Sequence, residues 1–109
     1  MNTTLIVTFN AQFAPRITAI RRAVFTGEQG IDTAKDLDGQ DPGAVHALVM
    51  VADGYVGTGR MLADGHIGRL AVLAPHRGKG LGARLVRALG EEARRKGLRR
   101  VYLGAQKQA

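Results

Sequence analysis

The chain has 109 residues, enough for one domain with a single hydrophobic core, and 45% of them are hydrophobic. It contains no cysteine, which excludes disulfides, thiolate catalysis and cysteine-based metal sites. Its net charge is +7, and residues 76–109 alone hold ten Lys/Arg against two Asp/Glu. Neither an apolar run of about 18 residues nor a basic leader is visible, so we expect a cytoplasmic protein without a membrane span.

The first part of the chain predicts a strand, a helix and a loop. Residues 3–9 contain enough apolar and β-branched side chains to form a strand. Pro15 fits the first turn of a helix, and apolar residues at helical spacing extend that helix to about Thr26, with Arg21 on its outer face. Residues 28–43 have no period, many turn formers and five acidic side chains, so we expect a loop.

Four further elements follow in the sequence. Residues 45–52 and 55–62 predict antiparallel strands, and Asp53-Gly54 between them is a tight-turn signal. Residues 67–73 predict the next strand, and residues 101–103 a short strand parallel to it, because a helix connects the two. We therefore expect one α/β (α+β) domain over residues 1–109: a mixed, mostly antiparallel sheet in the order β-α-β-β-β-α-β, with helices packed on it.

A glycine-rich turn separates the strand at 67–73 from a long helix. The turn reads Arg77-Gly78-Lys79-Gly80-Leu81-Gly82, and the helix runs to about Lys96 with an apolar face. Its four-residue repeat is Leu81, Leu85, Leu89 and Ala93, and Gly97 fits a left-handed C-terminal cap. Glycines that admit a ligand, together with unpartnered amides at a helix start, favour a bound phosphate. The alternative is an ordinary glycine turn with solvated basic residues.

Three phosphate-loop patterns can be compared with this turn. A Walker A loop needs Ser or Thr after Lys79, where Gly80 stands. The dinucleotide pattern is matched by Gly78, Gly80 and Ala83, but no acidic residue follows the next strand to hold a ribose. The third pattern, R/Q-x-x-G-x-G/A, is filled by Arg77, Gly80 and Gly82.

With the preceding strand, the segment LAVLAPHRGKGLG resembles the acetyl-CoA signature of the GCN5-related N-acetyltransferase (GNAT) family. FTGEQG, AVHALV and VGTGRML are similar to small bacterial members. The resemblance implies acetyl-CoA as the cofactor, with the pantetheine arm on the backbone of Leu70, Ala71 and Val72 and the amide of Val72 facing the thioester oxygen. It also implies a pyrophosphate cradle made of Arg77, Gly78, Lys79, Gly80, Leu81, Gly82 and Ala83.

The general base is harder to assign from the sequence. Glu28 follows the first helix, where the family's acceptor channel lies, and could take a proton directly or through water; the alternative is a solvated carboxylate. His46 is expected to be a hydrogen-bonded core residue, and His66 and His76 are expected to lie at turns. Arg60 could bind an acceptor carboxylate or form a surface ion pair. The histidines have no paired spacing, so we expect no metal site.

Family members usually continue with a short helix and a final strand pair, which commonly carry a Tyr that protonates the coenzyme A thiolate. This sequence ends at Ala109, so we expect a C-terminally short form in which residues 101–103 are an exposed edge, able to pair with a second copy. The predicted function is acetyl transfer from acetyl-CoA to a primary amine. The alternatives are an inactive coenzyme A-binding domain and a small basic nucleic-acid-binding domain. The second is disfavoured because Tyr102 is the only aromatic residue of the basic third.

Overall fold

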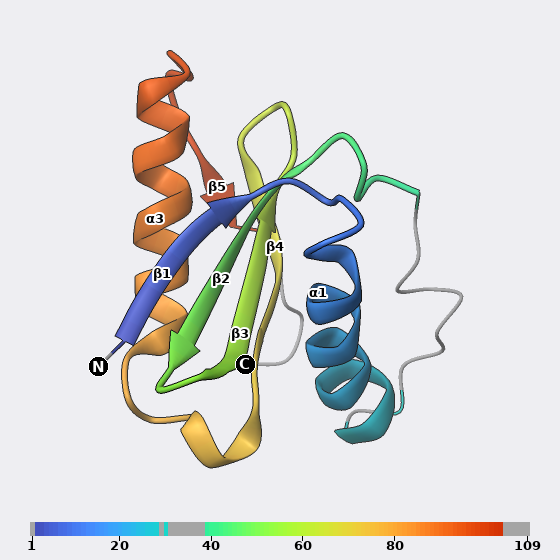
Figure 1. The fold of residues 1–109 in the computed structure, drawn as a ribbon. Helices are drawn as coiled ribbons and strands as arrows, with labels where there is room; N and C mark the ends of the chain where they lie inside the picture. Colours follow the sequence, from blue (N-terminus) through green and yellow to red (C-terminus); the bar gives the residue numbers. More distant parts are fainter. Residues whose placement is uncertain (1, 29, 31–38, 104–109) are drawn as a thin grey trace.

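The computed structural model describes residues 2–28, 30 and 39–103, and Figure 1 shows their arrangement. One five-stranded sheet in the order β1-β2-β3-β4-β5 forms the centre. The predicted order β-α-β-β-β-α-β and the mixed, mostly antiparallel sheet are confirmed. The strands are β1 (Asn2–Val7), β2 (Val45–Val51), β3 (Gly54–Met61), β4 (His66–Val72) and β5 (Tyr102–Leu103).

Each strand of the sheet pairs with the strand that comes next in the sequence. The pairs β1/β2, β2/β3 and β3/β4 are antiparallel. A tight turn at Ala52-Asp53 joins β2 to β3. β4 and β5 are parallel, as expected for strands connected by a helix, with His66 opposite Tyr102 and Ile67 opposite Leu103. The side chains of Tyr102 and Leu103 are exposed at this edge of the sheet. Pairing of the edge with a second copy stays a prediction.

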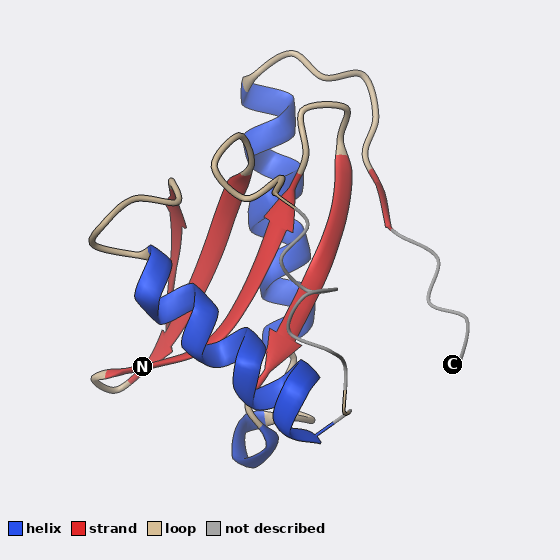
Figure 2. Cartoon of the chain, turned by 90° about the vertical axis from the view of Figure 1, so that its right-hand side faces the viewer, coloured by secondary structure: helices blue, strands red, loops and turns tan. Residues whose placement is uncertain are grey.

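The first helix crosses one face of the sheet, in front of the strands in Figure 2. α1 (Ala14–Arg21) has Pro15 in its first turn, and Asn10 Oδ1 accepts hydrogen bonds from two amides just before the helix begins. The chain continues as a π-helical segment, η1 (Arg22–Glu28), so helical structure extends two residues beyond the predicted end. The expected outward position of Arg21 is wrong: this side chain is only 2% exposed.

α3 (Leu81–Arg95) covers the opposite face of the sheet. Its predicted apolar face is confirmed, since Leu81, Leu85, Leu89 and Ala93 are buried. Each buried leucine contributes roughly 1.5–3 kcal/mol of transfer free energy. The helix ends in the expected left-handed cap: Gly97 has φ +83°, and the amide of Leu98 donates to the carbonyl of Ala93 at 3.0 Å.

Gly59 on β3 lets α3 lie close against the sheet. A Cβ at this position would be 2.6 Å from Cδ2 of Leu70 and 3.4 Å from Cδ1 of Leu89. The missing side chain therefore makes room for these two leucines, which pack with the buried core between α3 and the strands.

Within the described ranges, none of the helices combines the length and the apolar character needed to cross a membrane.

Candidate functional site

The connection from β4 to α3 is a short 3-10 turn, η2 (Ala74–His76), followed by the glycine-rich loop. Gly78 and Gly80 have φ values of +77° and +79°, a region that other residues rarely adopt. A Cβ added at either glycine would meet no described heavy atom within 4 Å. The loop thus needs glycine for its backbone conformation, and the space beside these glycines is open.

The start of α3 presents unpartnered amides to that space. Gly80 is the N-cap residue and supplies no side-chain cap. The first helical hydrogen bond is donated by the amide of Arg84 to the carbonyl of Gly80 at 3.1 Å. The amides of Leu81, Gly82 and Ala83 precede it, so they have no acceptor within the helix, and they bond to no other described segment. These donors, with the positive end of the helix dipole, form a site suited to an anion.

Basic side chains surround the same loop. Lys79 and Arg84 are exposed, and Nε of Arg77 donates to the carbonyl of Val72, the last residue of β4, at 2.8 Å. Arg77 therefore ties the loop to the end of the strand. Leu81 is buried and anchors the first turn of α3 in the core. The structure thus brings all seven residues of the predicted cradle into one loop and helix start.

The three strand residues predicted to hold the pantetheine arm differ in their orientation. The amide of Leu73 donates to Val56 on β3 at 2.9 Å, so the neighbouring amide of Val72 points to the other edge of β4, because backbone groups alternate along a strand. In the described structure, β5 pairs with β4 only at His66 and Ile67. The edge of β4 beside Val72 therefore has no described neighbouring strand. The side chain of Ala71 is buried against α1, and that of Leu70 packs toward α3.

A β-bulge interrupts β4 between its pairing segments. Gly68 pairs with Arg60 and Ala71 with Thr58, so Arg69 and Leu70 together oppose the single residue Gly59. Arg69 takes φ +49°, an uncommon conformation for a residue with a side chain. Such strain persists only where the surrounding structure imposes it, and it concentrates at functional sites.

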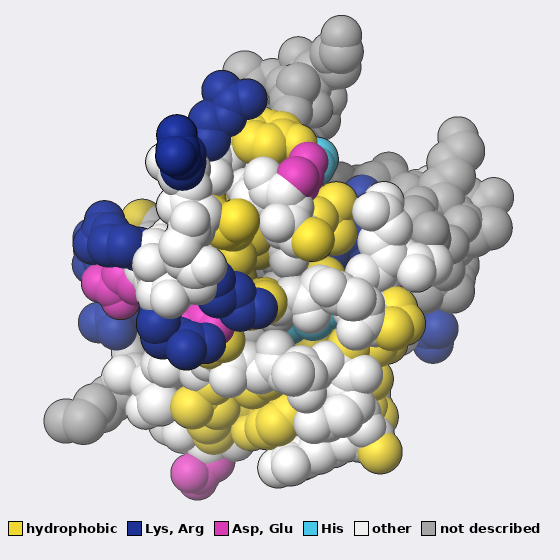
Figure 3. Space-filling view, turned by 90° about the horizontal axis from the view of Figure 1, so that it is seen from above, with side chains coloured by type: hydrophobic (Ala, Val, Ile, Leu, Met, Phe, Trp, Pro, Cys, Tyr) yellow, Lys and Arg dark blue, Asp and Glu magenta, His cyan; other side chains and the backbone are white. Residues whose placement is uncertain are grey.

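Basic residues also gather at the opposite end of α3, which Figure 3 shows from above. Arg94, Arg95, Lys96, Arg99 and Arg100 are all exposed there, as predicted for a solvated helix end. Arg95 pairs with Glu92 on the same helix. This basic region lies a full helix length from the glycine loop, so the two are separate surfaces.

A buried ion cluster under α1 was missed by the sequence reasoning. Asp41 Oδ1 accepts hydrogen bonds from Arg21 at 2.8 Å and Arg60 at 3.0 Å, and all three residues are at most 5% exposed. The expected surface position of Arg60 is therefore wrong, because its ion pair is buried. Burial alone would raise the pKa of Asp41, but the hydrogen bonds and charges of Arg21 and Arg60 outweigh it and hold the pKa below its usual value.

His46 completes this cluster and lies in the core, as predicted. Its Nε2 is 3.0 Å from the carbonyl oxygen of Asp41, and the side chain is fully buried. Burial lowers the pKa of His46, although the neighbouring Asp41 opposes the shift. His46 is therefore a neutral structural residue that helps to fix the segment leading into β2.

Glu28, the predicted base, is the last residue of η1. Its side chain lies outside the described part of the structure, so its role stays a prediction.

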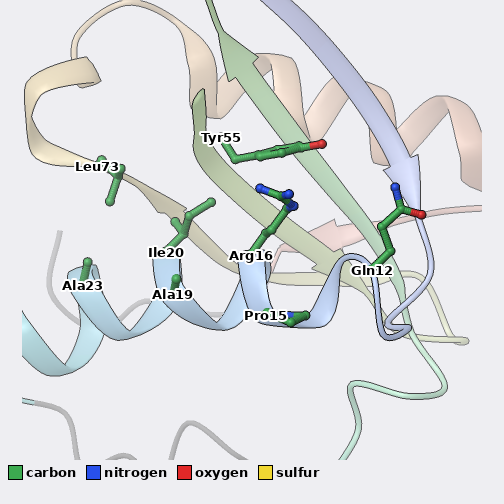
Figure 4. Close-up of a pocket in the computed structure, with 8 residues that line it drawn as sticks. All are labelled: Gln12, Pro15, Arg16, Ala19, Ile20, Ala23, Tyr55 and Leu73. Carbon is green, nitrogen blue, oxygen red and sulfur yellow. The ribbon is translucent and has the colours of Figure 1, made fainter. Parts of the chain in front are cut away.

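An apolar cavity of about 550 Å³ lies between α1 and the start of β3, shown in Figure 4. The guanidinium of Arg16 is 4.8 Å from the centre of the Tyr55 ring, a cation–π contact inside this cavity. The described residues that form its walls are Gln12, Pro15, Arg16, Ala19, Ile20, Ala23, Tyr55 and Leu73, and the residues predicted to bind coenzyme A are not among them.

Comparison with known proteins identifies the family of this chain. The model described as the acetyltransferase (GNAT) family matches residues 14–109. The uncharacterized protein YyaT of Bacillus subtilis strain 168 is 38% identical over 96 residues, covering 83% of this chain. The chain spans 65% of the length of YyaT.

Solved structures share the fold. The crystal structure of ElaA from Escherichia coli has a TM-score of 0.85 at 27% identity, covering 98% of this chain and 80% of ElaA. The aminoglycoside N-acetyltransferase AAC(6')-Iy, crystallised in complex with CoA, has a TM-score of 0.73 at 16% identity, covering 99% of this chain and 80% of that one. The second likeness shows the fold alone.

Proposed function

Because the chain belongs to the acetyltransferase (GNAT) family, we propose that it transfers an acetyl group from acetyl-CoA to a primary amine. The observation that carries the proposal is the start of α3, where the amides of Leu81, Gly82 and Ala83 lack acceptors beside two glycines at positive φ. A diphosphate is the group that such a set of donors fits best, since it offers several anionic oxygens close together.

The residues present fit coenzyme A in two ways. Arg77, Lys79 and Arg84 add positive charge around the amide donors, which favours the pyrophosphate. The edge of β4 at Val72 offers an amide to an extended arm, as a neighbouring strand would. When bound, acetyl-CoA supplies the acetyl group as an activated thioester. The chain's own part is to hold the donor, orient it against the amine and accept a proton.

A thiol-release assay with a panel of primary amines tests the proposal. Acetyl-CoA should release thiol only when an amine is present, and a Glu28→Gln variant should show whether that carboxylate takes part. Unaltered turnover of Glu28→Gln across pH would remove Glu28 as the base. Coenzyme A binding without release for any amine would instead identify an inactive coenzyme A-binding domain.

A further inference from the structure

The cavity between α1 and the start of β3 has no part in the proposed transfer. Its volume of about 550 Å³ lies within the range of about 300–1,000 Å³ that is typical of small-molecule pockets. Among the described residues that line it, Arg16 alone is charged, and a guanidinium repels a protonated amine. The cavity therefore lies apart from the pyrophosphate cradle and disfavours the amine acceptor, yet it has the size of a ligand site.

One end of the cavity carries unused hydrogen-bond donors. The guanidinium of Arg16 lies over the ring of Tyr55, 4.8 Å from its centre, and stacking of this kind uses the face of the guanidinium and leaves its N–H groups directed outward. Within the described part of the chain, neither this guanidinium nor the side-chain amide of Gln12 makes a hydrogen bond or an ion pair. Gln12 and the hydroxyl of Tyr55 lie toward the same end as Arg16 (Figure 4).

The other end of the cavity is apolar. From Arg16 it continues past Ala19 and Ile20 to Ala23 and Leu73, none of which has a polar side chain (Figure 4). Arg16 and Ala23 are seven residues apart, which corresponds to about 10 Å along a helix. These walls can remove an alkyl chain of about that length from water. The cavity thus combines one cationic end with an apolar channel.

The charge of the polar end limits the ligand to a monoanion. A carboxylate can accept two parallel hydrogen bonds from one guanidinium, and these charge-assisted bonds are stronger than neutral ones. A phosphate monoester carries more negative charge, but no second cation is found among the described residues of the cavity. A single carboxylate is therefore the anion that Arg16 and Gln12 fit best.

We propose that this cavity binds a monocarboxylic acid with an unbranched apolar tail, about as long as octanoate. The carboxylate lies on Arg16 and Gln12, and the tail follows Ile20 toward Leu73. The positive charge selects the acid over an amine of the same length, and the apolar walls select it over acetate. This site goes beyond the proposed function and does not depend on it.

Titration of the ¹⁵N-labelled chain with octanoate, followed by NMR, tests the site. The backbone amide signals of Arg16, Ala19, Tyr55 and Leu73 should shift together and reach saturation. Acetate, which lacks the tail, and octylamine, which carries the opposite charge, should not saturate these shifts over the same concentrations. Added coenzyme A should leave the octanoate shifts in place, because the residues predicted to bind it do not line the cavity.

Two variants test the two ends of the cavity separately. Arg16→Gln removes the charge and should weaken octanoate binding at least tenfold. Ala19→Leu keeps the charge but fills the apolar part, so it should abolish binding; leucine is a good helix former, which preserves α1. Arg94→Gln is the matched control: it removes the same charge from an exposed position on α3 and should leave octanoate affinity unchanged. Circular dichroism establishes that each variant is folded.

Several results would overturn this site. They are the absence of saturable octanoate shifts, shifts confined to the start of α3 or to its basic end, and equal binding of octylamine. Unaltered affinity in both Arg16→Gln and Ala19→Leu, or displacement of octanoate by coenzyme A, would do so as well. A chain that binds octanoate in the cavity but does not bind coenzyme A would support the site and count against the proposed function.

Discussion

Replacing Asp41 by asparagine tests whether the buried ion cluster stabilises the fold. The change keeps the size of the side chain but removes the negative charge that Arg21 and Arg60 share at 2.8 and 3.0 Å. Hydrogen bonds to a charged group contribute about 1.5–3 kcal/mol each, and removing one partner of a buried pair typically costs about 3–5 kcal/mol. We expect a loss of about 3 kcal/mol, at the lower end of that range, because Arg21 and Arg60 each have a further interaction besides the one with Asp41.

Urea denaturation followed by circular dichroism measures this loss. Asp53→Asn, in the exposed turn between β2 and β3, is the matched control and should change the free energy of unfolding by less than about 0.5 kcal/mol. A loss below about 1 kcal/mol for Asp41→Asn would mean that the carboxylate is hydrated or unpaired in solution and that the buried ion cluster does not stabilise the fold.

Three further predictions concern the loop, the core and the pH dependence. Gly80→Val should weaken coenzyme A binding at least tenfold, about 1.4 kcal/mol, because valine disfavours φ +79°; Gly90→Ala, inside α3, should leave binding unchanged, as calorimetry can check. Leu89→Ala should lower the free energy of unfolding by about 2–5 kcal/mol, read from its urea midpoint. The pKa of His46 is lowered in the folded chain, so the unfolded chain binds a proton first as the pH falls. The free energy of unfolding should therefore decrease as the pH drops below 6.5, the ordinary pKa of histidine. A curve of this free energy against pH should be flatter in that range for His46→Gln.

The elements built from local pattern were predictable from the sequence. The repeat of Leu81, Leu85 and Leu89 identified the buried face of α3, and Gly97 its end, because both signals arise within a few residues of the chain. The glycine loop was recognisable for the same reason, since its conformation depends on its own residues.

The buried charges could not be found in this way. Arg21 and Arg60 lie 20 and 19 residues from Asp41 in the sequence. Taken alone, each is an arginine of the kind usually found at the surface. Only the packing of α1 on the sheet brings them together. The stacking of His66 on Tyr102 was hidden similarly, because Tyr102 comes from a strand 36 residues later, after α3.

Calorimetry of the purified chain with coenzyme A and, separately, with a DNA or RNA oligomer tests most directly whether the start of α3 holds a pyrophosphate. We expect saturable binding of coenzyme A, which Arg77→Ala should weaken and Gly80→Val should weaken further. Binding of the oligomer without binding of coenzyme A would contradict this expectation, since the amides at the start of α3 would then have no pyrophosphate to hold.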